Sequence, residues 1–172
     1  SQMNLMGMHI DYGGMPSVRL AVRGYETITI ARERIDGQIR MENHLEVYGY
    51  DQDQFKSIEF NLKEILPNER VHTRQLLMDY AGEVCERRLQ EKGNSQDSDW
   101  SVLVKGQLIY LESYFRSRGS FSGMDALIWS NVSPSGGMSS SSALVISTAI
   151  AAMGVNGVDP RKDMDSADLV DG

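Results

Sequence analysis

A segment made almost entirely of glycine and serine, residues 133–143, lies between two apolar runs and constrains the fold more than any other feature. The run before it, residues 126–129, has the length of a buried strand. The run after it, residues 143–153, is rich in alanine, has no helix breaker and predicts a buried helix. A glycine turn that leads into a helix brings free backbone N–H groups together at the positive end of the helix dipole. This order of elements predicts a site for an anion such as phosphate, to which serine hydroxyls add hydrogen bonds.

A second interpretation of this segment stays open, because a glycine- and serine-rich stretch is more often a flexible linker or a helix N-cap. A linker, however, is not normally framed by a buried strand and a buried helix. The segment also lacks the Gly-Lys-Ser/Thr ending of the usual P-loop, and the chain contains no Gly-x-Ser-x-Gly nucleophile elbow. We therefore interpret the segment as a phosphate-binding loop of another kind.

Residues 134–143 read Pro-Ser-Gly-Gly-Met-Ser-Ser-Ser-Ser-Ala and closely resemble the phosphate-binding motif of the GHMP kinases, which include galactokinase, homoserine kinase, mevalonate kinase and phosphomevalonate kinase. Ser133 stands where an aliphatic residue is usual in that family. Ser141 takes the position of the Mg²⁺ ligand, although the run of serines leaves Ser140 and Ser142 open for that role. The resemblance implies that the phosphates of ATP bind at Pro134, Gly136, Gly137, Met138, Ser139, Ser140 and Ser141.

The N-terminal segment, residues 4–12, is similar to the Asn-Leu-Ile-Gly-Glu-His-Thr-Asp-Tyr stretch of galactokinases, in which Glu, His and Asp hold the hydroxyls of the sugar. The resemblance implies that His9, Asp11 and Tyr12 bind the substrate. From the residues alone, a turn with local hydrogen bonds is the favoured interpretation of His9 and Asp11. A zinc site is not expected, since the chain has three histidines and no further ligand cluster follows.

Two positions in this segment depart from the galactokinase pattern. Gln2 stands in place of an arginine that lies near the reacting hydroxyl in the family, and a neutral side chain does not supply that charge. Met8 replaces the glutamate and cannot accept a hydrogen bond from a sugar hydroxyl. Galactose is therefore a less expected substrate than a relative of it, such as a deoxy sugar or a pentose.

Residues 100–106 resemble the Trp-x-x-Tyr-Val-x-Gly helix start of galactokinases, whose tryptophan and tyrosine lie beside the adenine of ATP. The resemblance implies that Trp100 contacts adenine. Leu103 replaces the tyrosine and would give apolar contact alone. Without the resemblance, a tryptophan at the start of a helix is more often a packing residue.

The remaining pattern predicts an α+β domain of layered sheet and helices. Strands are predicted within residues 17–32, 38–50 and 55–62, with a hairpin turn at Asp36-Gly37. Amphipathic helices are predicted over residues 73–92 and 100–118, and a last helix runs to residue 172 from Asp159 as N-cap and Pro160 at its first position. The family resemblance implies a ribosomal protein S5 domain 2-like fold.

Length, charge and cysteine content favour a single domain and argue against several classes of partner and environment. The 172 residues are enough for one well-packed domain and few for two. The net charge of −7 argues against nucleic-acid and anionic-membrane partners. The single cysteine, Cys85, excludes an internal disulfide, is expected to be a core thiol and suits the cytoplasm. No apolar run reaches the length of roughly 18 residues that a transmembrane helix needs.

The resemblance implies transfer of the γ-phosphoryl group of ATP, with Mg²⁺ as cofactor, to a hydroxyl of a small sugar. Galactokinase-like members carry their catalytic aspartate well beyond the serine motif, so no catalytic residue is assigned here. We expect residues 1–172 to be the N-terminal, ATP-binding domain of a GHMP kinase, truncated before its C-terminal domain and inactive or nearly so alone. The alternative hypothesis is a non-catalytic, galactokinase-like sensor of sugar and nucleotide, which Gln2 in place of arginine favours.

Overall fold

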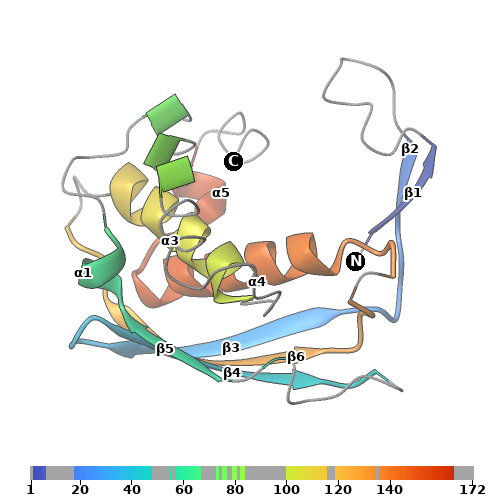
Figure 1. Ribbon diagram of the computed structural model, residues 1–172, viewed down its shortest axis with the longest axis horizontal. Coiled ribbons are helices and arrows are strands. Elements are labelled where there is room, and N and C mark those ends of the chain that lie inside the picture. Colours follow the sequence, from blue (N-terminus) through green and yellow to red (C-terminus); the bar gives the residue numbers. More distant parts are fainter. Residues whose placement is uncertain are drawn as a thin grey trace.

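A mixed sheet covered on one face by helices forms the body of the computed structural model (Figure 1). The structure describes residues 2–6, 18–47, 55, 57–66, 73, 75–76, 79–80, 82–83, 100–115, 119–134 and 136–164. The strands are β1 (Gln2–Met6), β2 (Val18–Ala21), β3 (Thr27–Arg34), β4 (Gln38–Leu45), β5 (Ile58–Asn61) and β6 (Gly123–Ser130). The helices are α1 (Leu62–Ile65), α3 (Ser101–Phe115), α4 (Ser140–Val155) and α5 (Pro160–Asp163).

The main sheet has the strand order β3-β6-β4-β5. Strand β6 pairs antiparallel with β3 and parallel with β4, so that Ser130 lies opposite Thr27 on one side and Leu45 on the other. Strand β5 pairs antiparallel with β4. Strands β1 and β2 form a separate antiparallel pair, drawn at the right of Figure 1. This combination of a mixed sheet with helices on one face confirms the predicted α+β class.

The connection at Asp36-Gly37 turns the chain, but the predicted hairpin is wrong. Strands β3 and β4 do not pair with each other, because β6 is inserted between them. Gly37 has a φ of 75°, which a tight reversal requires and glycine allows. The turn residues specify only this local reversal of the chain and not which strands pair. The hydrogen bonds of an apolar strand are satisfied on both edges only when it enters the middle of a sheet, and this decides the pairing.

The core lies between the sheet and the helices. Alternate side chains of β4 and β6 point toward the helices, as the pleat of a strand requires. Helix α3 turns its apolar stripe toward the same space, and α4 packs against β3 and α3. The buried residues that share this core include Ile39, Met41, Val104, Leu108, Leu111, Phe115, Met124, Ile128, Ala152 and Met153.

Two helices are less enclosed than their composition predicts. Leu103, at the start of α3, has 42% of its surface exposed. On α4, Ile146 and Ile150 are 59% and 53% exposed, although the alanine-rich run predicts a buried helix. The side chains at these positions lie one turn apart and therefore form one apolar strip on the outer side of α4.

The C-terminal helix begins where the sequence predicts and ends earlier. Asp159 caps α5 by accepting a hydrogen bond from the backbone N–H of Arg161 at 3.1 Å, and Pro160 occupies the first turn. This helix ends at Asp163, since Met164 is extended, and the remainder of the predicted helix, residues 165–172, lies outside the described residues. Residues 75–76, 79–80 and 82–83 are helical, within the predicted helix 73–92, whereas Cys85 lies outside the described residues. None of the described helices is long and apolar enough to cross a membrane.

Ion pairs on the outer face of the sheet join the β3–β4 connection to β6. Arg34 donates hydrogen bonds to both Asp36 and Asp125, and Arg32 donates to Asp125 at 2.9 Å. The Arg34 guanidinium, as the strongest of several hydrogen-bonding partners, lowers the pKa of Asp36 to about 2. The hydrogen bond from Arg32 is the largest of the effects that lower the pKa of Asp125.

Candidate functional site

The glycine- and serine-rich segment joins the end of β6 to the start of α4, as its flanking runs predict. The backbone N–H of Gly136 donates to the carbonyl of Ser133 at 3.3 Å and closes a turn. Gly137 then adopts a φ of 71°, and Ser139 a φ of 55° with a ψ of 46°. A serine in the left-handed region is uncommon, and such residues gather in ligand-binding loops. The chain therefore reaches α4 through two left-handed residues.

The first N–H groups of α4 have no intrahelical acceptors. The first helical bond runs from the N–H of Ala143 to the carbonyl of Ser139 at 3.0 Å, which leaves the N–H groups of Ser140, Ser141 and Ser142 beyond the hydrogen-bond ladder. Ser139 stands at the N-cap position but makes no capping hydrogen bond through its side chain. The ordinary N-cap interpretation of these serines is therefore weakened, and donors remain for an external acceptor.

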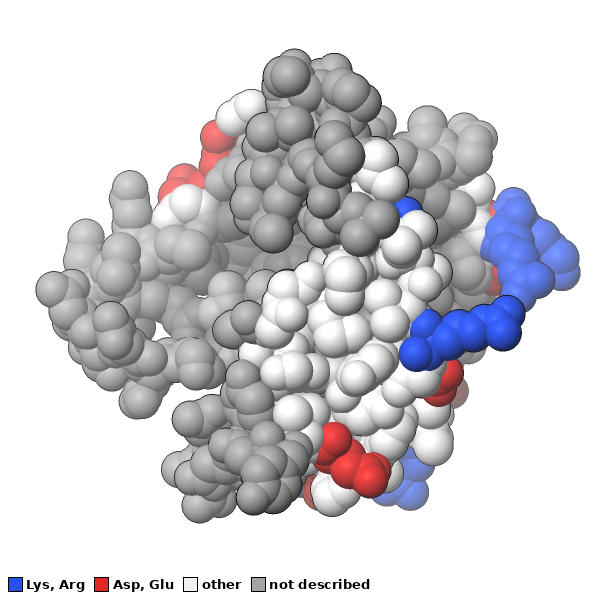
Figure 2. All heavy atoms as spheres, turned by 90° about the vertical axis from the view of Figure 1, so that its right-hand side faces the viewer, with Lys and Arg blue, Asp and Glu red and all other residues white. Residues whose placement is uncertain are grey.

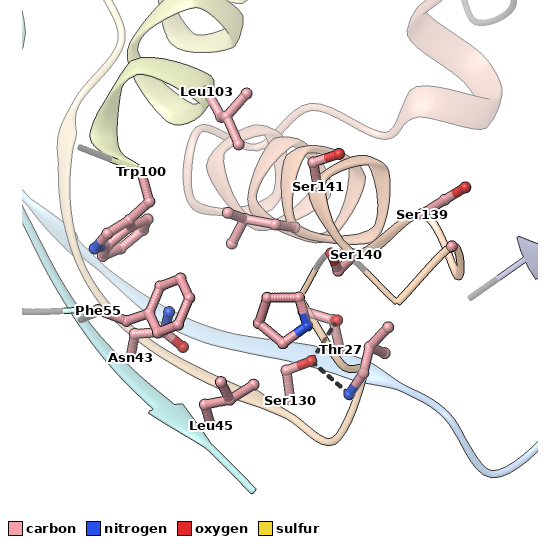
Figure 3. Close-up of a pocket in the computed structure, with 14 residues that line it drawn as sticks. Thr27, Asn43, Leu45, Phe55, Trp100, Leu103, Ser130, Ser139, Ser140 and Ser141 are labelled. Atoms are coloured by element: carbon pink, nitrogen blue, oxygen red, sulfur yellow. Dashed lines mark hydrogen bonds between the residues drawn. The ribbon is translucent and has the colours of Figure 1, made fainter. Parts of the chain in front are cut away.

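The serines and Trp100 line the same pocket, which has a volume of about 320 Å³ (Figure 3). Residues from the serine motif that line it are Pro134, Gly137, Ser139, Ser140 and Ser141. Gly136 and Met138 are predicted phosphate-binding residues that do not line it, and Ser142 is exposed outside it. The predicted substrate residues His9, Asp11 and Tyr12 lie outside the described residues, as does Met8. The structure thus brings together two of the three predicted motifs, which lie far apart in the chain.

One end of the pocket is aromatic and apolar. Trp100 is 7% exposed, and in Figure 3 its ring lies near that of Phe55 at the side of the pocket away from Ser139. Leu103, which stands in place of the family tyrosine, also lines the pocket. Flat apolar walls of this kind suit a planar ring, and the serine end suits a charged or strongly polar group.

Asn43 is a pocket residue that the sequence interpretation missed. Its Oδ1 atom is buried and has no hydrogen-bond partner within the part of the chain that the structure describes. A buried acceptor without a partner is costly and rare in folded proteins. The signal was present in the sequence, because Asn43 interrupts the apolar alternation of Ile39, Met41 and Leu45 on β4. A polar residue on the buried face of a strand is an indication of a ligand contact.

The floor of the pocket carries two further hydroxyls, from Thr27 on β3 and Ser130 on β6. Their Oγ1 and Oγ atoms are 3.0 Å apart, and the backbone N–H of Val132 donates to Ser130 Oγ at 3.1 Å. Neither residue was singled out from the sequence. Their position depends on the pairing of β3 with β6, which sequence patterns did not predict.

Figure 2 shows the face of the molecule at which α4 begins. The described residues at the centre of this face carry no charge, and a group of Lys and Arg side chains lies at the right of the view in Figure 2. Among the described residues, no group of three or more His, Cys, Asp or Glu could hold a metal ion. An anion bound here would be held by backbone N–H groups, hydroxyls and the dipole of α4.

A comparison with protein families agrees with this geometry. Residues 103–171 match the model of the GHMP kinases N terminal domain. The matched part contains most of α3 and all of β6, the serine segment and α4, and it supports a kinase of the GHMP family that binds a nucleotide. The galactokinase-like branch is not distinguished by this match, because residues 4–12 and Trp100 lie outside it. A search of curated proteins finds no relative that matches.

Proposed function

We propose that this chain is the ATP-binding, N-terminal domain of a galactokinase-like sugar kinase and has the ribosomal protein S5 domain 2-like fold. The observation that carries the proposal is the pocket shared by Trp100 and the serine motif. These two segments were predicted separately, one for adenine and one for phosphate. Their meeting in one pocket fits a single ligand with an aromatic ring at one end and phosphates at the other.

The phosphates would lie at the start of α4. The N–H groups of Ser140, Ser141 and Ser142 are the donors that the helix leaves unpaired, and the open space beside Gly137 lets a ligand approach the backbone. Ser140 and Ser141 line the same pocket, and a serine hydroxyl is an oxygen ligand of the kind that Mg²⁺ accepts alongside phosphate oxygens. Mg²⁺ bound there would neutralise the phosphate charge that develops during transfer.

The base would lie between Trp100 and Phe55. Asn43 Oδ1 lies at this end of the pocket in Figure 3 and would accept a hydrogen bond from the exocyclic amino group of adenine. This bond would satisfy an acceptor that the protein itself leaves unpaired. The proposal therefore accounts for a feature that packing alone does not explain.

The sugar and the catalytic base complete the proposal. His9, Asp11 and Tyr12 would bind the sugar, on the strength of the N-terminal resemblance. A C-terminal domain of the full-length protein would supply the catalytic aspartate. The exposed apolar strip of Ile146 and Ile150 on α4 supports such a further domain, because neighbouring large apolar side chains at a surface are typical of an interface.

Calorimetry of Mg·ATP binding tests the proposal on the chain of 172 residues. We expect magnesium-dependent binding that weakens about tenfold in Ser141→Ala, since a hydrogen bond to a charged group contributes about 1.5 kcal/mol or more. Ser142→Ala is the matched control, because that hydroxyl is one residue away and does not line the pocket. Absence of binding by the folded chain, or equal loss in both variants, would contradict the proposal. Binding without turnover by a full-length protein would instead favour the sensor.

A further inference from the structure

Two threonine–serine pairs tie β3 to its neighbours, and they differ in how their hydrogens are used. In the first pair, Thr29 donates to Ser147 Oγ at 3.0 Å, and Ser147 donates to the carbonyl of Leu144 at 3.1 Å. Both hydroxyl hydrogens are therefore satisfied inside the protein. This pair is a closed hydrogen-bond chain between β3 and α4 and needs no ligand.

In the second pair, Thr27 and Ser130, only one of the two hydroxyl hydrogens has an acceptor among the described residues. The two hydroxyls lie 3.0 Å apart, and one hydrogen lies between them. Ser130 Oγ also accepts from the N–H of Val132, so that bond uses no hydroxyl hydrogen. In the described part of the chain the other hydroxyl hydrogen has no acceptor. Ser130 is 8% exposed and Thr27 is half-buried, and both line the pocket, so the remaining hydrogen is a donor at the pocket wall whichever hydroxyl carries it.

The pair stands between the two ends of the pocket. Thr27 and Ser130 are opposite each other in the β3–β6 register, and Leu45 of β4 continues the same row across the sheet. In Figure 3 this row runs along the floor of the pocket, from Leu45 below Phe55, through Ser130, to Thr27 below Ser140. A ligand that spans the pocket from ring to phosphate would pass over it.

We propose that the Thr27–Ser130 pair is the subsite that recognises the ribose of the nucleotide, by donating its remaining hydrogen to a ribose hydroxyl. This inference rests on the proposed function. The ribose is the part of ATP that joins base to phosphates, so it falls in the middle of the pocket. A ribose hydroxyl both accepts and donates, which matches a pair with one free hydrogen and remaining lone pairs. The pair is thus a determinant of ribonucleotide over deoxyribonucleotide binding.

The unmodified chain gives the first test, by calorimetry with Mg²⁺ and ATP, 2′-deoxy-ATP or 3′-deoxy-ATP. We expect one of the deoxy nucleotides to bind about tenfold more weakly than ATP, because the pair is left unsatisfied. Equal affinity for all three nucleotides would overturn the inference while leaving the proposed function standing. Failure to bind ATP at all would overturn the proposed function and the inference with it.

A double substitution, Thr27→Val with Ser130→Ala, gives the second test. Both hydroxyls are removed together, because either one alone keeps a hydrogen to donate. We expect ATP binding to weaken about tenfold and the preference for ATP over the deoxy nucleotide to disappear. The matched control is Thr29→Val with Ser147→Ala, which removes the same atoms from the closed pair outside the pocket and should keep the preference.

The fold of each variant is checked by circular dichroism and by its unfolding midpoint before binding is measured. If the first double variant folds and still prefers ATP over both deoxy nucleotides, the pair does not contact the ribose and the inference is wrong. If the control variant loses the preference equally, the effect comes from β3 as a whole and the inference is also wrong.

Discussion

At the scale of single residues, we expect a substitution of Asn43 to raise the stability of the fold and to lower the affinity for nucleotide. Replacement of Asn43 by leucine, which has a similar volume, removes a buried acceptor that has no partner within the described residues. We expect the free energy of unfolding to rise by about 1 kcal/mol, because the desolvation penalty of that oxygen disappears. Affinity for Mg·ATP should fall about tenfold in the same variant. Urea denaturation and calorimetry measure the two effects, and a less stable variant with unchanged affinity would refute this role.

Gly137 offers a second residue-scale prediction, with Gly24 as its matched control. Both glycines have φ between 70° and 80°, and a Cβ at either position would meet no protein atom within 4 Å. Gly137→Ala and Gly24→Ala should therefore each lower the free energy of unfolding by about 1 kcal/mol, through backbone strain alone. Only Gly137→Ala should weaken ATP binding, because only Gly137 lines the pocket. Equal affinities in the two variants would show that the loop does not approach a ligand closely.

At the scale of elements, the ion pairs that join the β3–β4 connection to β6 predict a dependence of stability on pH. The pKa of Asp36 is lowered from 3.8 to about 2, chiefly by Arg34, so its ionised form is favoured in the folded state. A lowered pKa stabilises the fold above the unfolded value and loses this contribution as pH falls from about 4 to about 2. Asp36→Asn should therefore be less stable than the parent at pH 6 and match it near pH 2.

Urea unfolding midpoints between pH 2 and pH 6 test this expectation. Both residues of the pair are partly exposed, so added salt should reduce the difference at pH 6. A difference that stays constant with pH would mean that Asp36 acts through its hydrogen bond to the N–H of Gln38 and not through its charge.

Local sequence patterns predict the positions of single elements but not the order of the strands in the sheet. The strand at residues 126–129, the helix after the serine segment, the stripe of α3 and the cap of α5 are set by neighbours in the chain, and they occur close to the predicted positions. The order of strands is set by contacts between residues far apart. The turn at Asp36-Gly37 could not reveal that β6 would separate the strands it joins.

At the scale of the whole molecule, the same insertion of β6 builds the part of the site that sequence patterns missed. The serine motif and Trp100 were recognisable because each lies within one short stretch. Thr27 and Asn43 belong to strands that the predicted hairpin would have paired directly, which would have left no place for Ser130 between them. Because β6 enters there, hydroxyls and an amide from three strands face one pocket, with Trp100 and the start of α4 as its opposite ends. The strand order therefore decides which polar groups a bound nucleotide would meet, and the loop motif decides where its phosphates would lie.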